Sequence, residues 1–184
     1  MSLDRFSDSL QGGFWVARSG SDHSDFCIHF HENKDHIFDF ALRMLGDKQA
    51  AGDITQDVFM KLFENRNRIR EIQNIRGWLF ISARNMCLNH LRDRRKVISM
   101  EEIDQEHSND SAGDNPQLGI LKKAMAELDD RFREAVILRE FQGFSYSEMA
   151  EILQITVSAV RSLLFNARIR LRENYEKIEK ARLI

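Results

Sequence analysis

Apolar residues recur at every third or fourth position along most of the chain, a spacing typical of amphipathic helices. Three such stretches follow one another between residues 31 and 96. The first ends at Gly46, and glycine often terminates helices because it tolerates a left-handed backbone. Its apolar side consists of Ile37, Phe38, Ala41, Leu42 and Leu45. We therefore expect a helix that packs through this side and stops at Gly46.

The second stretch, residues 48–66, is strongly amphipathic. Its apolar side consists of Ile54, Val58, Phe59, Leu62 and Phe63. The other side of the same helix holds Asp53, Gln56, Asp57 and Lys61. We expect the first set to be buried and the second to face solvent.

The third stretch, residues 74–96, begins at Asn74, a residue type that caps helices with its side chain. Its apolar positions are Trp78, Leu79, Ile81 and Met86. It closes in a basic cluster of Arg92, Arg94, Arg95 and Lys96. Because cations near a helix C-terminus also complement the helix dipole, this cluster alone is weak support for nucleic-acid binding.

After Pro116 the pattern predicts helices at residues 117–128 and 129–141, followed by a stop at Gly143. The buried side expected for the second of these consists of Phe132, Ala135, Val136, Leu138 and Phe141. A short helix then starts at Ser145, which together with Glu148 forms the signature of a capping box. A turn at Gln154 and Ile155 precedes a final helix, capped by Thr156. The apolar side of that helix consists of Val157, Val160, Leu164, Ala167 and Leu171.

The last two helices match the helix-turn-helix pattern of DNA-binding proteins. The turn is short, Ala150 is small where the helices cross, and Val160 follows ten residues later in the core. The exposed side of the final helix carries Ser158, Arg161, Ser162, Arg168 and Arg172. We expect Thr156, Ser158 and Arg161 to meet base edges in a major groove, and the later arginines to reach phosphates. The alternative is that these arginines only solvate a terminal helix.

The chain has 184 residues, of which 42% are hydrophobic and 30% charged, as in a globular protein of one ordinary domain or two small ones. It contains no run of about 18 apolar residues and no secretory signal. We therefore expect a cytoplasmic protein with no membrane insertion of its own. The two cysteines, Cys27 and Cys87, are far apart, and we expect them to be reduced thiols.

Charge is distributed unevenly along the chain. The net charges of residues 1–30, 31–96, 97–116 and 117–184 are −2, +4, −6 and +2. Residues 97–116 are rich in Ser, Asn, Asp and Gly, which predicts a flexible, extended acidic linker between two mildly basic domains. Residues 1–25 show no sustained period and predict a poorly ordered N-terminal extension.

Two blocks, in this order, resemble regions two and four of a bacterial RNA polymerase sigma factor of the extracytoplasmic-function (ECF) type. The first runs from FALRMLGDKQAAGDITQDVFMKLFENR to IRGWLFISARNMCLNHLRDRRK, and the second is LDDRFREAVILREFQGFSYSEMAEILQITVSAVRSLLFNARIRLRE. The resemblance implies an all-α fold of two small helical domains. Region two would be a three- or four-helix bundle at residues 26–96, and region four a helix-turn-helix bundle at residues 117–184, joined by the linker at 97–116.

By this resemblance the chain would bind core RNA polymerase and direct promoter-specific transcription initiation, under the control of an anti-sigma factor. The implied polymerase contacts are Asp53, Gln56, Asp57 and Lys61. The third helix and the loop before it, Asn65 to Ile75, would open the minus-ten promoter element and hold a flipped base. The residues that would line this path are the four arginines Arg76, Arg84, Arg92 and Arg95, together with Asn85. The implied contacts to the minus-thirty-five element are Thr156, Ser158, Arg161, Ser162 and Arg168.

Several residues limit what the resemblance transfers. Gln154 stands where the turn commonly has Gly, Thr156 where Pro is frequent, and Leu163 where many relatives carry a basic residue. Promoter preference is therefore not transferable. Trp78 is a potential base-stacking residue, but its spacing with Leu79 favours a place in the core.

Two other functions are compatible with parts of the sequence. A free-standing helix-turn-helix regulator would bind duplex DNA without polymerase, usually as a symmetric dimer on a palindrome. A metal site would use His23, Cys27, His29 and His31, but this segment lacks a second ligand pair at structural-zinc spacing. No set of nucleophile and base, phosphate-binding glycine loop or pair of catalytic carboxylates stands out. We expect no enzymatic activity, cofactor or resident metal.

Overall fold

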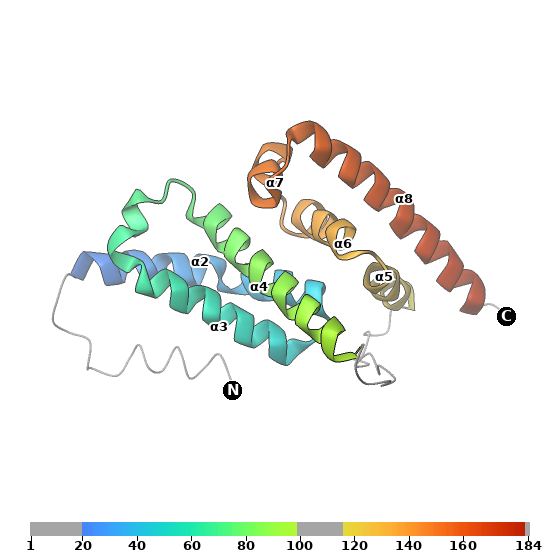
Figure 1. The fold of residues 1–184 in the computed structure, drawn as a ribbon, viewed down its shortest axis with the longest axis horizontal. Coiled ribbons are helices and arrows are strands. Elements are labelled where there is room, and N and C mark those ends of the chain that lie inside the picture. Colours follow the sequence, from blue (N-terminus) through green and yellow to red (C-terminus); the bar gives the residue numbers. More distant parts are fainter. Residues whose placement is uncertain (1–19, 99–115, 183–184) are drawn as a thin grey trace. The chain divides into compact units, whose positions relative to one another are not determined.

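The computed structural model describes residues 20–98 and 116–182, and every regular element within these ranges is a helix (Figure 1). This confirms the all-α prediction. Contacts divide the chain into two units, residues 1–91 and 92–184. No helix among the described residues is long and apolar enough to cross a membrane.

The first described helix, α2, starts at Gly20, upstream of the domain boundary predicted at residue 26. Most of the predicted N-terminal extension and of the predicted acidic linker lies outside the described residues. The first unit is built from α2 (Gly20–Leu45), α3 (Lys48–Glu64), the 3-10 helix η1 (Arg66–Glu71) and the greater part of α4 (Ile75–Ile98).

The helix ends in the first unit follow local signals in the sequence. Gly46 ends α2 with a left-handed φ of +69°. At the start of α3, Asp47 Oδ1 accepts a hydrogen bond from the backbone N–H of Gln49 at 2.8 Å. Asn74 Oδ1 accepts one from the N–H of Gly77, also at 2.8 Å, at the start of α4. The predicted stop at Gly46 and the predicted cap at Asn74 are confirmed.

Aromatic side chains join α2 to α3 in the core of the first unit. Phe26 packs edge to face against Phe63, with ring centroids 5.3 Å apart. One turn later, Phe30 meets Phe59 in the same way at 4.9 Å. The fully buried Phe26 therefore anchors the first turns of α2, which explains why the helix extends upstream of the predicted boundary.

The buried side of α4 differs from the prediction. It consists of Leu79, Phe80, Ala83, Cys87 and Leu91. Trp78, Ile81 and Met86, which we expected in the core, are only half-buried. Residues 78–81 are all apolar and go once around the helix, so spacing alone does not decide which side packs. The packing partner decides which side of α4 is buried, because Phe80 meets Phe40 of α2 edge to face, with ring centroids 5.4 Å apart.

The second unit contains a helical pair that precedes the helix-turn-helix. From residue 116 onward, the elements of the second unit are α5 (Pro116–Ala126), α6 (Asp130–Val136), the π-helix η2 (Ile137–Phe141), α7 (Tyr146–Leu153) and α8 (Val157–Arg182). Arg133 fixes the turn between α5 and α6. Its guanidinium donates to the backbone oxygens of Met125 at 3.0 Å, Ala126 at 2.6 Å and Leu128 at 2.7 Å. These bonds give donors to carbonyl groups at the end of α5 and in the turn after it, where helical backbone partners run out.

Arg133 performs this role while largely buried. Burial lowers the pKa of its guanidinium, and the neighbouring Asp130 carboxylate, 3.6 Å away, opposes that shift. The carbonyl partners and Asp130 together compensate for removing the charge from water. The sequence pattern gave no indication of this contact.

The helix-turn-helix is capped as predicted. Ser145 Oγ accepts from the N–H of Glu148 at 3.3 Å, while Glu148 Oε2 accepts from the N–H of Ser145 at 2.8 Å, which confirms the capping box. Thr156 Oγ1 accepts from the N–H of Ala159 at 3.2 Å. Between α7 and α8, Gln154 has a left-handed φ of +57°. Most side chains are strained there.

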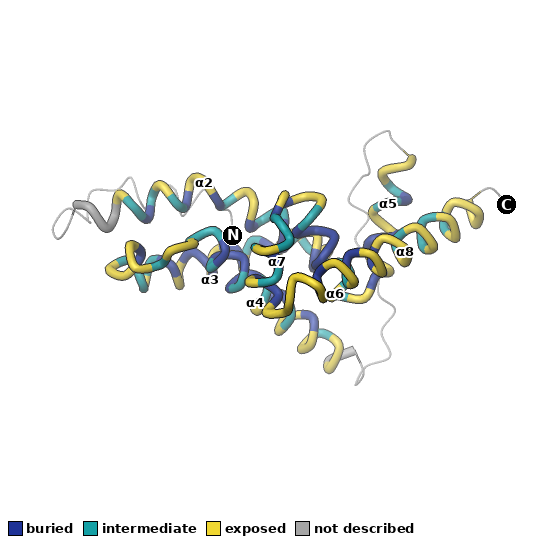
Figure 2. The backbone as a smooth tube through the Cα atoms, turned by 90° about the horizontal axis from the view of Figure 1, so that it is seen from above, coloured by how far each residue is buried: buried dark blue, intermediate teal, exposed yellow. Residues whose placement is uncertain are grey.

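Buried positions alternate with exposed ones along α3 and α8 (Figure 2). In α8 three of the predicted apolar residues are buried, Val160, Leu164 and Ala167, while Leu171 is only half-buried. Val157, the first residue of α8, is 37% exposed instead of buried, and Phe141 is 38% exposed. Phe141 ends η2, where the π-helical turn holds one more residue than an α-turn and shifts the register of the side chains.

Candidate protein and nucleic-acid interfaces

The outer side of α3 carries the residues expected to contact the polymerase. Asp53, Gln56 and Asp57 are exposed, and their spacing puts them on one side of the helix. Neither carboxylate forms an ion pair with any residue that the structure describes. Met60 shares this side and is 38% exposed, although the sequence analysis did not select it. We call Asp53, Gln56, Asp57 and Met60 the α3 surface.

Lys61 is exposed but has a different environment from the α3 surface. Its Nζ lies 5.7 Å from the centroid of the Trp78 ring, a cation–π distance. Trp78 is therefore neither a core residue nor an isolated exposed ring. The contact connects α3 to the first turns of α4. Lys61 therefore has a structural partner, which was not expected when Lys61 was grouped with Asp57 as a polymerase contact.

The residues of α4 expected to contact DNA do not all share one side. The helical period places Arg84, Asn85, Arg92 and Arg95 within about 100° of one another, and Arg76 on another side. Asn85, Arg92 and Arg95 are exposed, while Arg84 is half-buried. The Arg76 guanidinium lies 5.7 Å from the ring centroid of Phe80. The predicted set thus divides into a track along α4 and a single arginine near its start.

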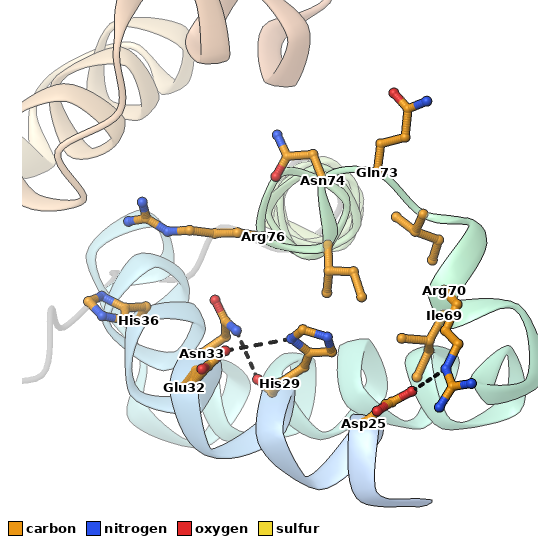
Figure 3. A pocket seen from close by; sticks show the side chains of 12 residues that line it. Asp25, His29, Glu32, Asn33, His36, Ile69, Arg70, Gln73, Asn74 and Arg76 are labelled. Carbon is orange, nitrogen blue, oxygen red and sulfur yellow. Dashed lines mark hydrogen bonds and ion pairs between the residues drawn. The ribbon is translucent and has the colours of Figure 1, made fainter. Parts of the chain in front are cut away.

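Arg76 lines a hollow of about 730 Å³ in the first unit (Figure 3). The hollow lies between one side of α2, the end of η1 with the residues that follow it, and the start of α4. At one edge, Arg70 Nε pairs with Asp25 Oδ2 at 2.8 Å. On α2, His29 Nδ1 lies 3.6 Å from Glu32 Oε2. The sequence predicted a base-holding loop here but not the contribution of α2.

The histidines of α2 and Cys27 are the residues of the alternative metal site. The segment is helical, so His29 and His31 lie about 200° apart around α2 and do not converge. His29 lines the hollow, whereas His31 is exposed. Within the part of the chain that the structure describes, no group of three potential ligands forms a metal site. The side chain of His23 lies outside that part.

The exposed side of α8 carries the residues expected to contact DNA. Ser158, Arg161, Ser162 and Arg168 are all exposed, as is the capping residue Thr156. Arg161 forms no ion pair with a described residue. Arg168 Nη2, in contrast, lies 2.6 Å from Glu140 Oε1, and this hydrogen bond raises the pKa of Arg168.

Phe165 is the residue of α8 that sequence reasoning missed. Its side chain is 66% exposed, and it follows Arg161 by one turn and precedes Arg168 by three residues. An apolar ring between two arginines suits contact with a base methyl group or a sugar. The sequence contained one signal for Phe165, because this apolar residue lies outside the apolar side of α8 formed by Val160, Leu164 and Ala167. We call Ser158, Arg161, Ser162, Phe165 and Arg168 the α8 surface.

Comparison with known proteins identifies the same two blocks. Sigma-70 region 2 matches residues 29–97, and Sigma-70 region 4 matches residues 118–171. The RNA polymerase sigma factor YlaC of Bacillus subtilis strain 168 is 30% identical over 149 residues, which cover 77% of this chain and 86% of YlaC. The ECF RNA polymerase sigma factor SigM of the same strain is 28% identical over 146 residues, covering 77% of this chain and 89% of SigM.

A solved structure agrees with these matches. The sigma factor RpoE from Bartonella quintana, in complex with the anti-sigma factor NepR, superimposes with a TM-score of 0.70. The two chains are 26% identical, and the match covers 83% of this chain and 97% of RpoE. Sigma factors are regulatory proteins rather than enzymes. The chain therefore belongs to the ECF-type RNA polymerase sigma factor family.

Proposed function

We propose that this chain binds core RNA polymerase through the α3 surface and directs promoter-specific initiation through α4 and α8. The observation that carries the proposal is the α3 surface itself. Two carboxylates and an amide share one side of α3 with an exposed methionine, and no described cation of the chain neutralises the carboxylates. Such a surface fits a basic partner that also offers a small apolar contact.

The minus-ten element would be opened by α4 and the loop before it. Arg84, Asn85, Arg92 and Arg95 supply a track for the phosphates of a single strand. The hollow beside the start of α4 supplies a place for one base taken out of the stack. Arg76, which lies apart from the track, belongs to the hollow.

The minus-thirty-five element would be bound as duplex by the α8 surface. The first residues of α8 enter the major groove, where Thr156, Ser158 and Arg161 meet base edges. Arg168 lies two turns further along and reaches a phosphate. Because the second unit carries a net charge of only +2 from residue 117 onward, most of the affinity would come from simultaneous binding to polymerase and the minus-ten strand.

An anti-sigma factor would keep the chain inactive by covering the same surfaces. The support is the similarity to RpoE, which was solved with the anti-sigma factor NepR. The acidic residues 97–116 would extend between the two domains into the polymerase. A factor that acts on polymerase and promoter DNA would work in the cytoplasm.

Run-off transcription tests the proposal. Purified core polymerase is supplied with a library of promoter templates, with and without the full-length chain, and the transcripts are sequenced. We expect new start sites that share a minus-ten and a minus-thirty-five element. A template with a scrambled minus-thirty-five element is the matched control.

The alternative function gives a different result in a gel-shift assay. A free-standing regulator would bind a palindromic duplex tightly without polymerase, and would add no transcript when mixed with core enzyme. That combination would contradict the proposal.

A further inference from the structure

Gly52 lies inside α3, where the fold has room for a side chain. Its backbone is helical, and a Cβ atom added to it would have no atom of another part of the fold within 4 Å. A glycine inside a helix lowers the equilibrium constant for folding about fivefold relative to alanine, because glycine adds freedom to the unfolded chain. The first unit therefore carries a cost in stability at Gly52 that no internal contact requires.

Three other glycines do have an internal reason for lacking a side chain. Gly46 and Gly143 have left-handed φ values of +69° and +72°. A Cβ atom on Gly77 would lie 2.7 Å from Asn74 Nδ2, inside the cap of α4. Neither reason applies to Gly52. Glycine also allows a group from outside the chain to approach the backbone closely, and this use is compatible with the position of Gly52.

The missing side chain leaves a notch between two glutamines. Gln49 precedes Gly52 by three residues and Gln56 follows it by four, so the helical period puts all three on one side of α3. Both glutamines are exposed, and their side-chain amides have no hydrogen-bond partner among the described residues. Each amide offers an acceptor oxygen to an incoming donor. We call Gln49, Gly52 and Gln56 the Gly52 notch.

The charge beside the Gly52 notch is negative. Asp53 follows Gly52 directly, and its exposed carboxylate forms no ion pair with a described residue. A cation would be attracted to this carboxylate, and its N–H groups could donate to the amide oxygens of the notch. Lysine and arginine also carry a long aliphatic stem, which can lie against the bare backbone of a glycine.

We propose that the Gly52 notch receives one long basic side chain of core polymerase, with its stem on Gly52 and its charge beside Asp53. This inference rests on the proposed function, because it names a contact within the binding of α3 to polymerase. Gly52 contributes to this contact through the space that it leaves open. A side chain at residue 52 would occupy the place of the stem.

Filling the notch separates polymerase binding from stability. The labelled full-length chain is titrated with core polymerase as wild type, Gly52→Ala and Gly52→Leu. We expect the affinity to fall about fivefold for alanine and about a hundredfold for leucine, since the cost of overpacking grows with the added volume. Both variants should unfold at a higher urea concentration than the wild type, because both residues favour the helix. A loss of affinity in a more stable protein is not due to misfolding.

The control enlarges another exposed small residue. Ala181 lies near the end of α8, outside the α3 and α8 surfaces, and Ala181→Leu should bind core polymerase like the wild type. A loss of affinity in Ala181→Leu equal to that in Gly52→Leu would overturn the inference, as would wild-type affinity of both Gly52 variants.

A double-variant cycle tests the charge of the incoming group. Asp53→Ala should weaken core binding in the wild type, but by less than twofold in the Gly52→Leu background, where the basic side chain no longer reaches Asp53. Equal effects of Asp53→Ala in the two backgrounds would show that Gly52 and Asp53 do not share a ligand, and the inference would be wrong. Binding and run-off transcription by the wild type would then leave the proposed function standing, whereas a wild-type chain that does not bind core polymerase would contradict the function itself.

Discussion

Arg168 of α8 and Glu140 of η2 form an ion pair on the side of the second unit assigned to DNA, with Nη2 and Oε1 2.6 Å apart. The hydrogen bond raises the pKa of Arg168, so the guanidinium stays charged. Arg172, one turn further along α8, pairs with Glu176 of its own helix at 3.1 Å. Arg168 instead takes its acidic partner from another segment of the unit, η2. A DNA phosphate must therefore compete with Glu140 for Arg168.

Glu140→Gln should raise the affinity of the chain for duplex DNA of arbitrary sequence. The substitution removes the carboxylate that competes with phosphate for Arg168 and keeps the size of the side chain. One additional phosphate contact would steepen the dependence of log affinity on log salt by about 0.9. Fluorescence anisotropy at several salt concentrations measures both quantities.

The matched control is Glu127→Gln. It removes the acidic partner of Lys177, 3.9 Å away, and lies outside the α8 surface. We expect its salt dependence to equal that of the wild type. An unchanged slope for Glu140→Gln would show that Arg168 does not exchange Glu140 for a phosphate.

Gln154→Gly should stabilise the second unit. Gln154 has a φ of +57°, a conformation that glycine adopts without steric cost. Relief of this strain exceeds the entropy that glycine adds to the unfolded chain, and we expect the free energy of unfolding to rise by about 0.5–1 kcal/mol. Thermal unfolding followed by circular dichroism measures the change.

A second glycine variant separates this effect from any general effect of glycine. Glu151 is exposed and lies inside α7, where the backbone is helical. Glu151→Gly should lower the free energy of unfolding by about 1 kcal/mol. If Gln154→Gly also destabilises the protein, the left-handed turn is not a source of strain.

Arg133→Met should destabilise the second unit strongly. The methionine fills the same space but leaves the carbonyl oxygens of Met125, Ala126 and Leu128 without their donor. We expect the free energy of unfolding to fall by about 2–4 kcal/mol. Urea unfolding measures the loss, and Arg131→Met, an exposed neighbour, should change it by less than about 0.5 kcal/mol. Equal effects of the two variants would contradict the role of Arg133.

Local signals predicted the helix ends well, because a cap depends on residues that are close in sequence. Asn74, Thr156 and the Ser145–Glu148 pair all cap as expected. The upstream turns of α2 were less visible, since residues 21–25 are all polar and give no apolar spacing before Phe26. Their helical state depends on packing against α3, which the local pattern does not contain.

The candidate sites differ in the same way: features of a single helix were predictable, and features that depend on packing between distant segments were not. The α3 and α8 surfaces each come from one helix, so spacing was enough to find most of their members. The hollow could not be predicted as a whole, because Asn33 and the loop near Asn74 are distant in sequence and meet only in the fold. Phe165 was missed because apolar residues were expected only on the buried side of α8, and its place outside that side was not used as a signal.

The central claim is that the α3 surface binds core polymerase and the α8 surface binds upstream promoter DNA, independently of each other. Arg161→Ala should keep normal affinity for core polymerase, because α8 does not contribute to that contact. It should weaken recognition of the minus-thirty-five element by about fivefold to a hundredfold, the range of one specific base contact. Loss of both activities would instead indicate misfolding.

The most direct measurement uses the triple variant Asp53→Ala, Gln56→Ala, Asp57→Ala. Its affinity for core polymerase and its run-off transcription from a responsive promoter are compared with those of the wild type and of Arg161→Ala. We predict that the triple variant remains folded, loses core binding and gives little or no transcript. A triple variant that binds core polymerase and transcribes normally would contradict the account.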